Sequence, residues 1–222
     1  MQTSQLDHAA SDKPTDEVEA LPEPLELVVA DVFKLYTVRN LDDLAQVLHR
    51  RYREDATFID PTLAARPRSS VGLQFFALQK LFSDVRISNV RIGQPEVHQT
   101  KGQQPRLLEV VVHAQQDYQW SRTNHISRQI FPEHTCLQVT TALLLDPRTA
   151  QVVSHTDTWD DKSFKLPMAW RRLNNFSTNL VYRCLGWRSA LLRAEQKCAE
   201  AEAGSSDQGS GAKKGSTLGT LG

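Results

Sequence analysis

Three side chains in this sequence have types and spacing suited to proton transfer. Asp60 follows the apolar pair Phe58-Ile59 and precedes a proline in "EDATFIDPTLAARPRSS". In "VVSHTDTWD", the alternation of a strand places His155 and Asp157 on one face, two residues apart. Desolvation raises the pKa of a carboxylate beside apolar side chains, and a His–Asp pair suits acid–base work or binding of a ligand's polar end. The sequence therefore holds the parts of a proton-transferring pocket.

Each of these groups also has a structural interpretation. Asp60 could instead cap the turn at Pro61 by accepting hydrogen bonds from nearby backbone N–H groups. Strand alternation places Val153 and Trp159 on the same face as the His–Asp pair. That face could be the wet outer face of an antiparallel sheet, although the tryptophan favours an inward orientation. Both alternatives stay open at this point.

Three segments in the first half of the chain predict helices that would position these groups. Apolar residues recur at helical spacing in "PLELVVADVFKLYTV" and in "NLDDLAQVLHRRY". The segment "SSVGLQFFALQKLF" is apolar on most sides, which is typical of a buried helix. Between the second and third helices, "ATFID" predicts a short strand that Pro61 stops.

The pattern then changes to strands. "VRISNVRI", "PRLLEVVVHAQQDYQW", "HTCLQVTTALLL" and "AQVVSHTDTW" are rich in Val, Leu, Thr and aromatic residues and are separated by turn signals. The turn "DPRTA" around Pro147 predicts an antiparallel hairpin. Tyr118 and Trp120, two residues apart, are either cavity wall or core aromatics. Helices followed by antiparallel strands predict an α+β fold, with the helices in the concavity of a curved sheet.

The order of elements and one motif resemble the NTF2-like superfamily, the cone-shaped fold of ketosteroid isomerases and SnoaL-like polyketide cyclases. The likeness covers about Val28 to Asp160. "YREDATFIDPTLAARPRSSVGLQFF" resembles the ketosteroid isomerase segment with a "DAT-x-x-DP" strand and a "PR-x-G" turn, except that Ser69-Ser70 replace the glycine. "LLLDPRTAQVVSHTDTW" resembles that family's final hairpin. The resemblance implies an NTF2-like cone, N-terminal helices packed in a curved antiparallel sheet, to which this chain adds a C-terminal helical segment.

The resemblance also implies roles for particular residues. In ketosteroid isomerases the aspartate of this motif is the base beside a ketone, and a tyrosine and a protonated aspartate form the oxyanion hole. The base then corresponds to Asp60, and the tyrosine to Tyr36 or Leu35. The place of the protonated aspartate holds Thr141, which argues against steroid isomerisation. The catalytic candidates are Asp60, Tyr36, His155 and Asp157, and the ligand-binding candidates are Phe58, Phe76, Tyr118, Thr141 and Trp159.

The segment after the cone predicts a basic amphipathic helix. Residues 167–197 hold six arginines and lysines against the single Glu195, a net charge of +5, together with Trp170 and Trp187. Such a helix could lie on an anionic membrane, bind a partner, or pack on the exposed face of the sheet. The predicted organisation is a disordered acidic arm over 1–23, the NTF2-like domain over 24–165, the helical extension over 166–200 and a disordered Gly/Ser tail over 201–222.

The composition and the absence of certain motifs exclude several other classes of protein. Lys plus Arg and Asp plus Glu number 26 each, so no field that attracts nucleic acid is expected. The three cysteines and the scattered histidines have no ligand spacing, so we expect no metal and no cofactor. No P-loop, dinucleotide or G-x-S-x-G motif occurs. The absence of a secretory signal or membrane-length apolar run predicts an intracellular, cytoplasmic protein.

The predicted function is binding of a small apolar molecule in the cone. Proton transfer of the isomerase or cyclase type would use Asp60 as base, with Tyr36, His155 or Asp157 as polar helpers. The alternative is a non-catalytic interaction module whose cone is filled by side chains, acting through its sheet face or basic helix. A homodimer through the sheet and peripheral membrane contact through residues 167–197 are further hypotheses. An open cone of several hundred cubic ångströms would favour a ligand.

Overall fold

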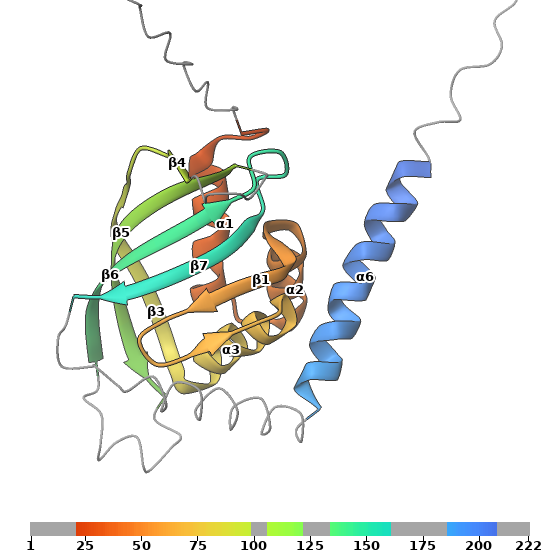
Figure 1. Cartoon of the computed structure of the whole chain (residues 1–222). Coiled ribbons are helices and arrows are strands. Elements are labelled where there is room, and N and C mark those ends of the chain that lie inside the picture. Colours follow the sequence, from red (N-terminus) through yellow and green to blue (C-terminus); the bar gives the residue numbers. More distant parts are fainter. Residues whose placement is uncertain (1–20, 99–105, 122–133, 161–185, 208–222) are drawn as a thin grey trace, which may run out of the picture.

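The computed structural model describes residues 21–98, 106–121, 134–160 and 186–207 (Figure 1). Each helix and strand predicted before residue 160 is present, and β2 and β4 are short additions. In chain order the elements are α1 (Leu25–Thr37), α2 (Leu41–Arg51), β1 (Tyr52–Ile59), β2 (Ala64–Ala65), α3 (Arg68–Leu81), β3 (Phe82–Ile92), β4 (Glu96–His98), β5 (Leu107–Trp120), β6 (His134–Leu145), β7 (Val152–Trp159) and α6 (Trp187–Asp207).

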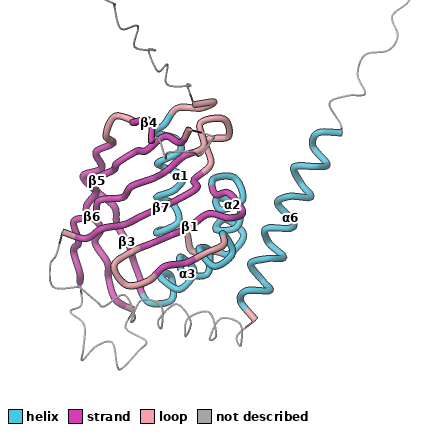
Figure 2. Tube along the Cα trace, viewed as in Figure 1, coloured by secondary structure: helices cyan, strands magenta, loops and turns pink. Residues whose placement is uncertain are grey.

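The seven strands form one sheet in the order β2-β1-β7-β6-β5-β3, with β4 paired to β5. Figures 1 and 2 show this sheet curving around the N-terminal helices. The α+β fold class, helices in the concavity of a curved sheet, is confirmed. Neighbouring strands are antiparallel except β1 and β7, which run parallel. No short turn fixes the relative direction of these two strands, because they are far apart in the chain.

The N-terminal helices follow from local sequence and burial. Asn40 caps α2, since its side chain accepts a hydrogen bond from the backbone N–H of Asp43 at 2.7 Å. Acidic residues lie in the first turn of α2 and basic residues in the last, as the helix dipole favours. In α3, all residues from Ser69 to Ala77 are buried, which explains why its sequence is apolar on most sides.

A bulge in β7 decides which of its residues point inward. Leu144 of β6 pairs with Ser154, whereas the next residue, Leu145, pairs with Val152. A bulge shifts the alternation by one residue, so Val152 is buried in place of the predicted Val153. Beyond the bulge the expected alternation holds, and the His–Asp pair of β7 faces the core.

The C-terminal helix α6 packs on α2 and α3, which corrects the hypothesis that it covers the exposed sheet face. Leu191 is fully buried beside Gly72, where a Cβ atom would lie 2.5 Å from Leu48 Cδ1 and 2.7 Å from Leu191 Cδ2. The missing side chain at Gly72 therefore gives Leu191 its place. The ring of Trp187 meets the ring of Phe76 edge-on at 5.1 Å.

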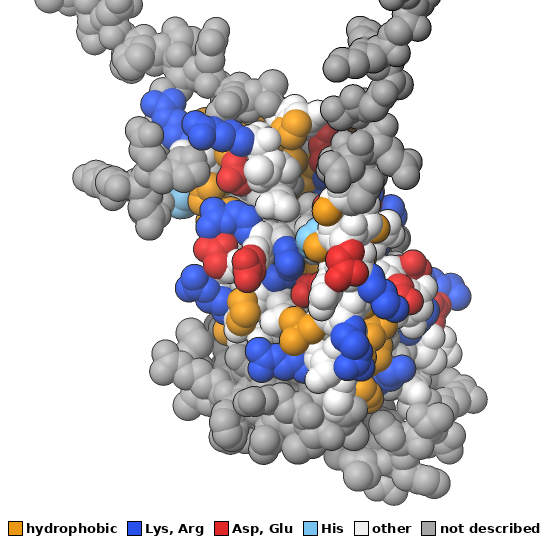
Figure 3. Space-filling view, turned by 90° about the vertical axis from the view of Figure 1, so that its right-hand side faces the viewer, with side chains coloured by type: hydrophobic (Ala, Val, Ile, Leu, Met, Phe, Trp, Pro, Cys, Tyr) orange, Lys and Arg blue, Asp and Glu red, His pale blue; other side chains and the backbone are white. Residues whose placement is uncertain are grey.

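The helix α6 extends to Asp207, so residues 201–207, expected in the tail, belong to the helix. The residues from Ala199 to Ala203 alternate alanine and glutamate, which are strong helix formers. The described part of this helix is not basic, because Arg188, Arg193 and Lys197 are balanced by acidic residues; the remaining arginines of 167–197 lie outside the described residues. Figure 3 shows positive and negative side chains interspersed on the face that it displays. None of the described helices is long and apolar enough to cross a membrane.

At the other end of the chain, folded contacts begin before the expected boundary at residue 24. Arg51 is buried, and its guanidinium binds both carboxylate oxygens of Glu23, with Nη2 2.8 Å from Oε2. The same guanidinium donates to Asp31 Oδ2 from Nε at 2.9 Å. The hydrogen bond from Arg51 lowers the pKa of Glu23. A buried cation needs such partners, so Glu23 belongs to the folded domain and not to the arm.

Candidate functional site

Five polar side chains meet inside the cone and form what we call the closed network. Its members come from four elements and none is more than 4% exposed. They are Tyr36 of α1, Tyr52 at the start of β1, Thr141 of β6, and His155 and Asp157 of β7. The structure thus brings together three predicted catalytic residues and Thr141, and it excludes the interpretation of the β7 face as an outer face.

The carboxylate of Asp157 is the acceptor at the centre of this network. Its Oδ1 accepts a hydrogen bond from Thr141 Oγ1 at 2.6 Å and lies 3.1 Å from His155 Nε2. Its Oδ2 accepts a hydrogen bond from the Tyr36 hydroxyl. Thr141 and Asp157 are direct partners across β6 and β7. The Thr141 hydroxyl is therefore already engaged with a carboxylate of the neighbouring strand.

The partners of His155 define where its ring carries a proton. Burial, together with the charge of Asp157, raises the pKa of Tyr36 and of Tyr52 well above the ordinary value, so both hydroxyls stay protonated. The Tyr52 hydroxyl lies 2.7 Å from Nδ1 and donates to it. A carboxylate oxygen only accepts, so Nε2 carries the proton that faces Asp157 Oδ1 and the Tyr36 oxygen, each at 3.1 Å, and Nδ1 is left as the acceptor for the Tyr52 hydroxyl.

Aromatic rings enclose the closed network. The ring of Phe58 lies edge-on to His155 at 4.9 Å, and the ring of Phe75 lies 5.0 Å from those of Tyr36 and Phe58. Phe76, which we predicted in the ligand-binding wall, instead turns toward Trp187 of α6. Consecutive helical residues point about 100° apart, so only one of the two phenylalanines can face the cone. Phe75 holds that position.

Asp60 lies where β1 ends and combines the two interpretations of its sequence. Its Oδ1 accepts hydrogen bonds from the Thr62 N–H at 2.6 Å, the Thr62 hydroxyl at 2.7 Å and the Leu63 N–H at 2.7 Å. These bonds make Oδ1 a turn cap. Burial nevertheless raises the pKa of Asp60 to about 6 against the effect of these bonds, and Asp157 adds a smaller repulsion. Since all three bonds end on Oδ1, the second oxygen is the one suited to chemistry.

Gln116 and Tyr118 of β5 lie on the same inner surface, and with Asp60 they form a second polar group. We call it the open end because its hydrogen-bonding capacity is not fully used, and not because it opens to solvent. The Tyr118 hydroxyl donates to Gln116 Oε1, and its pKa is raised by burial and by the charges of Asp157 and Asp60. Gln116 is fully buried, and its Nε2 amide has no hydrogen-bond partner within the described part of the chain. A buried donor without a partner is unusual, because it costs about 1–3 kcal/mol.

Sequence reasoning missed two residues of this interior. Tyr52 was assigned to the end of the second helix, where its hydroxyl had no evident role; its place at the first residue of β1 turns it inward. Gln116 stands two residues before Tyr118, so strand alternation could have found it. Trp159, a predicted ligand contact, is partly buried at the end of β7 and pairs with Val139.

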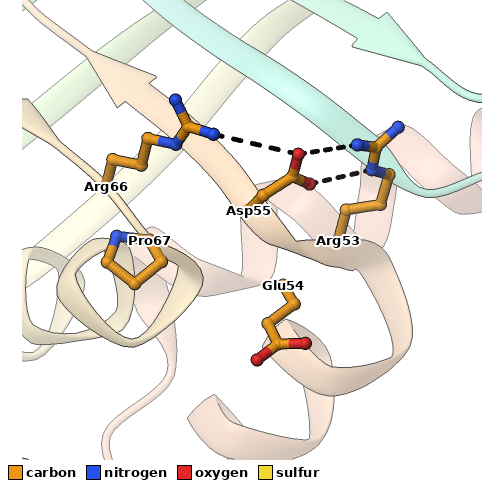
Figure 4. Close-up of a pocket in the computed structure, with 5 residues that line it drawn as sticks. All are labelled: Arg53, Glu54, Asp55, Arg66 and Pro67. Atoms are coloured by element: carbon orange, nitrogen blue, oxygen red, sulfur yellow. Dashed lines mark hydrogen bonds and ion pairs between the residues drawn. The ribbon is translucent and has the colours of Figure 1, made fainter.

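A separate hollow on the surface is lined by charged residues (Figure 4). Arg53 holds Asp55 through two hydrogen bonds of 2.9 and 2.7 Å, and Arg66 approaches the same carboxylate at 4.0 Å. Glu54 and Pro67 complete the lining. Both arginines are paired with Asp55, so this hollow offers no unpaired cation for an anionic ligand. Among the described residues, no cluster of His, Cys, Asp and Glu could hold a metal ion.

Comparison with known proteins gives matches in structure alone. No family model and no curated protein matches the sequence. The chain is similar to an NTF2-like protein of unknown function from Exiguobacterium sp. 255-15, at 8% identity over 61% of this chain and 99% of that one, with a TM-score of 0.44. A SnoaL-like family member from Agrobacterium tumefaciens matches at 10% identity over 61% and 97% of the two chains, with a TM-score of 0.40.

A third match is a hypothetical protein with a ketosteroid isomerase-like fold from Catenulispora acidiphila, solved in complex with trimethylamine. It shares 15% identity over 62% of this chain and 85% of that one, with a TM-score of 0.37. The three descriptions name the superfamily that the sequence resembles. At these scores the matches carry no argument about ligand or reaction, which must come from the residues of this chain.

Proposed function

We propose that the cone binds a small, largely apolar molecule bearing a carbonyl-type oxygen, and that Asp60 transfers a proton on that molecule. The observation that carries the proposal is the unpartnered Nε2 amide of the fully buried Gln116. A bound acceptor oxygen would satisfy this donor and would account for a polar group that otherwise destabilises the interior. Phe58 and Phe75 lie in the same interior, so an apolar ligand body would have aromatic surroundings.

Asp60 has the properties of a base in this arrangement. With a pKa of about 6, its carboxylate is mostly ionised at pH 7 and yet basic enough to remove a proton beside a carbonyl group. The fixed bonds to Oδ1 hold the side chain, so that Oδ2 is the oxygen that would accept the proton. Gln116 would stabilise negative charge that develops on the ligand oxygen. It is a neutral donor, so slow proton transfer is expected.

The closed network would then support this site without touching the ligand. Tyr36, His155 and Asp157, which we predicted to be catalytic, already bond to one another and to Tyr52 and Thr141. The negative charge of Asp157 contributes to the raised pKa of Asp60. Their proposed role is therefore to hold a charge at a fixed position behind the base.

The test measures proton exchange and ligand binding together. The wild-type protein is mixed with a panel of apolar ketones and enones in deuterated water, and exchange at the carbon beside the carbonyl is followed by NMR. Asp60→Asn should reduce any exchange rate by roughly 10²- to 10⁴-fold, whereas Asp55→Asn, a matched change on the surface, should leave it unchanged. Absence of exchange, with a pKa of Asp60 below the reference of about 3.9 and no ligand-induced shift around it, would refute the proposal.

The partner hypotheses stay predictions. Self-association through the sheet is tested by sedimentation equilibrium over a range of protein concentrations. Membrane contact through residues 167–197 is tested by co-sedimentation with anionic vesicles. Binding should weaken as salt is added, because the Debye length shortens to about 8 Å at physiological ionic strength. If the protein does not sediment with the vesicles at low salt, the membrane hypothesis is wrong.

A further inference from the structure

A buried ion pair joins the C-terminal helix to the body of the cone. Arg68, the first residue of α3, has its Nε 3.3 Å from Glu195 Oε1 of α6, an ion pair in which these two atoms make no hydrogen bond, and the two side chains are 16% and 10% exposed. The neighbouring Leu191 occupies the space beside Gly72. A cation at a helix N-terminus opposes the helix dipole, so the position of Arg68 needs a compensating contact. Glu195 provides it.

The same guanidinium also reaches the interior. Arg68 Nη1 donates a hydrogen bond of 3.0 Å to the backbone carbonyl of Tyr52, where α2 ends and β1 begins. The Tyr52 hydroxyl in turn donates to His155 Nδ1 at 2.7 Å. Three consecutive contacts therefore lead from α6 through Arg68 and Tyr52 to the imidazole ring of the closed network. The first two lie outside the cone and the third within it.

We propose that Arg68 is a positioning residue through which the docked helix α6 holds Tyr52, and with it the hydrogen bond to His155 Nδ1, in place. With Tyr52 fixed, its hydroxyl donates to Nδ1 and leaves the ring proton on Nε2, facing Asp157. When α6 leaves its seat, Arg68 follows Glu195 or turns to solvent, the Tyr52 carbonyl loses its donor, and the hydrogen bond between the Tyr52 hydroxyl and Nδ1 weakens. The docking of α6 is thus coupled to the hydrogen bonding of His155 inside the cone.

The first experiment uses the full chain and requires no ligand, so its outcome is independent of the proposed function. Nitrogen-15 NMR distinguishes the protonated from the unprotonated ring nitrogen of His155. Glu195→Gln, which weakens the ion pair, should shift the Nδ1 resonance toward its value in a ring that has lost the Tyr52 hydrogen bond. The matched control is Glu202→Gln, which removes the exposed pair with His49 on the same helix and should leave the ring unchanged. Tyr52→Phe, which deletes the donor to Nδ1, gives the reference for a released ring.

A second variant separates the two contacts of Arg68. Arg68→Lys keeps a cation near Glu195 but cannot serve the carboxylate and the carbonyl together, because an ammonium is a compact charge without the guanidinium fork. Amide hydrogen exchange should then show α6 docked as in the wild type, while the His155 resonances move. Arg68→Met, which removes both contacts, should change both readouts. Unchanged ring resonances in Arg68→Met and Arg68→Lys would overturn the proposal.

Coupling between two sites is reciprocal, which gives an independent check. If α6 holds Tyr52 in place, then Tyr52→Phe should loosen α6 and accelerate amide exchange around Leu191 by about fivefold or more, the lower end of typical couplings. The Tyr36→Phe variant disturbs the same network without touching Tyr52 and serves as the control. Equal exchange in α6 for Tyr52→Phe and wild type would contradict the coupling.

Discussion

Inside the cone, the tyrosines, the threonine, the histidine and Asp157 of the closed network all find protein partners, whereas the Gln116 amide of the open end finds none among the described residues. The two groups lie close enough for Asp157 to raise the pKa of Asp60 and of Tyr118. They share one fold and one interior, yet only the second keeps hydrogen-bonding capacity for another molecule.

The difference distinguishes side chains that hold the fold in place from side chains that can bind a ligand. A fully satisfied buried network fixes side chains in one arrangement, and it offers little to a ligand because each contact would have to be exchanged. A partly satisfied group is destabilising in the free protein and is satisfied on binding. Residue type alone would rank the His–Asp pair as the more reactive site. The hydrogen bonds that remain unmade in the free protein instead favour Asp60 and Gln116 as the site.

The largest expected effect comes from removing the central acceptor of the closed network. Asp157→Ala leaves Tyr36, Thr141 and His155 without the carboxylate, so the free energy of unfolding should fall by about 3–5 kcal/mol. Urea denaturation measures it. Asp160→Ala, at an exposed residue just beyond β7, should change stability by no more than about 0.5 kcal/mol. A loss below about 1 kcal/mol for Asp157→Ala would show that the network is not a structural unit.

Asp60→Asn tests the open end through the pH dependence of stability. The raised pKa means that the folded protein holds this proton between pH 3.8 and about 6, where the unfolded chain releases it. Stability from this group is therefore full below pH 3.8 and is lost as the pH rises toward 6, by about 3 kcal/mol at most. The asparagine variant keeps an acceptor for the Thr62 and Leu63 N–H groups. It has no carboxyl group at this position to titrate, so it should not lose this stability as the pH rises. Urea titrations from pH 4 to 7 should show the two stabilities converging at low pH.

A double-mutant cycle tests the open end. Tyr118→Phe removes the hydroxyl that donates to Gln116 Oε1 and should cost about 1–2 kcal/mol, whereas Gln116→Leu leaves that hydroxyl without a partner but also removes the unpartnered Nε2 amide, so its net cost should be smaller. The double variant removes both polar partners together with the unpartnered amide and should be at least as stable as the wild type. Ligand binding, by contrast, should be lost whenever Gln116 is replaced. Additive stability losses would indicate that the two side chains do not interact.

The smallest effect belongs to the charged hollow on the surface. Asp55→Asn breaks the pairs with Arg53 and Arg66, but exposed ion pairs contribute only about 0.2–1 kcal/mol. The hydrogen bond from Arg53 lowers the pKa of Asp55, so this small contribution should disappear as the pH falls below 4. Thermal unfolding at low and high salt measures it. A loss above about 2 kcal/mol would give this hollow a structural role that its exposure does not suggest.

Local patterns predicted the elements well, because capping at Asn40, helical spacing and strand alternation are encoded within a few residues. They did not predict the β7 bulge, which moved Val152 inward in place of Val153. They also did not predict the choice of Phe75 over Phe76, because α3 is apolar on both sides and its orientation is set by α6.

The inner site was only half predictable for a similar reason. Asp60, His155 and Asp157 were found from residue type and spacing. Tyr52 and Gln116 depend on which strand face meets the helices, and on how many partners each side chain finds across the fold. The seat of Leu191 depends on a glycine more than a hundred positions away, which no local pattern connects to it.

The parallel pairing of β1 with β7 has a consequence for synthesis of the chain. Tyr52 and His155 meet across a separation of 103 positions, and the pair of β1 and β2 joins the rest of the sheet only when β7 has been made. Until then a nascent chain carries α1 to α3 and strands β3 to β6, with an unpaired edge along β6 that is exposed to association with other chains. Contacts of such long range slow folding. Translation that pauses before residue 152 should therefore yield a species prone to aggregate, and release past residue 159 should let it close.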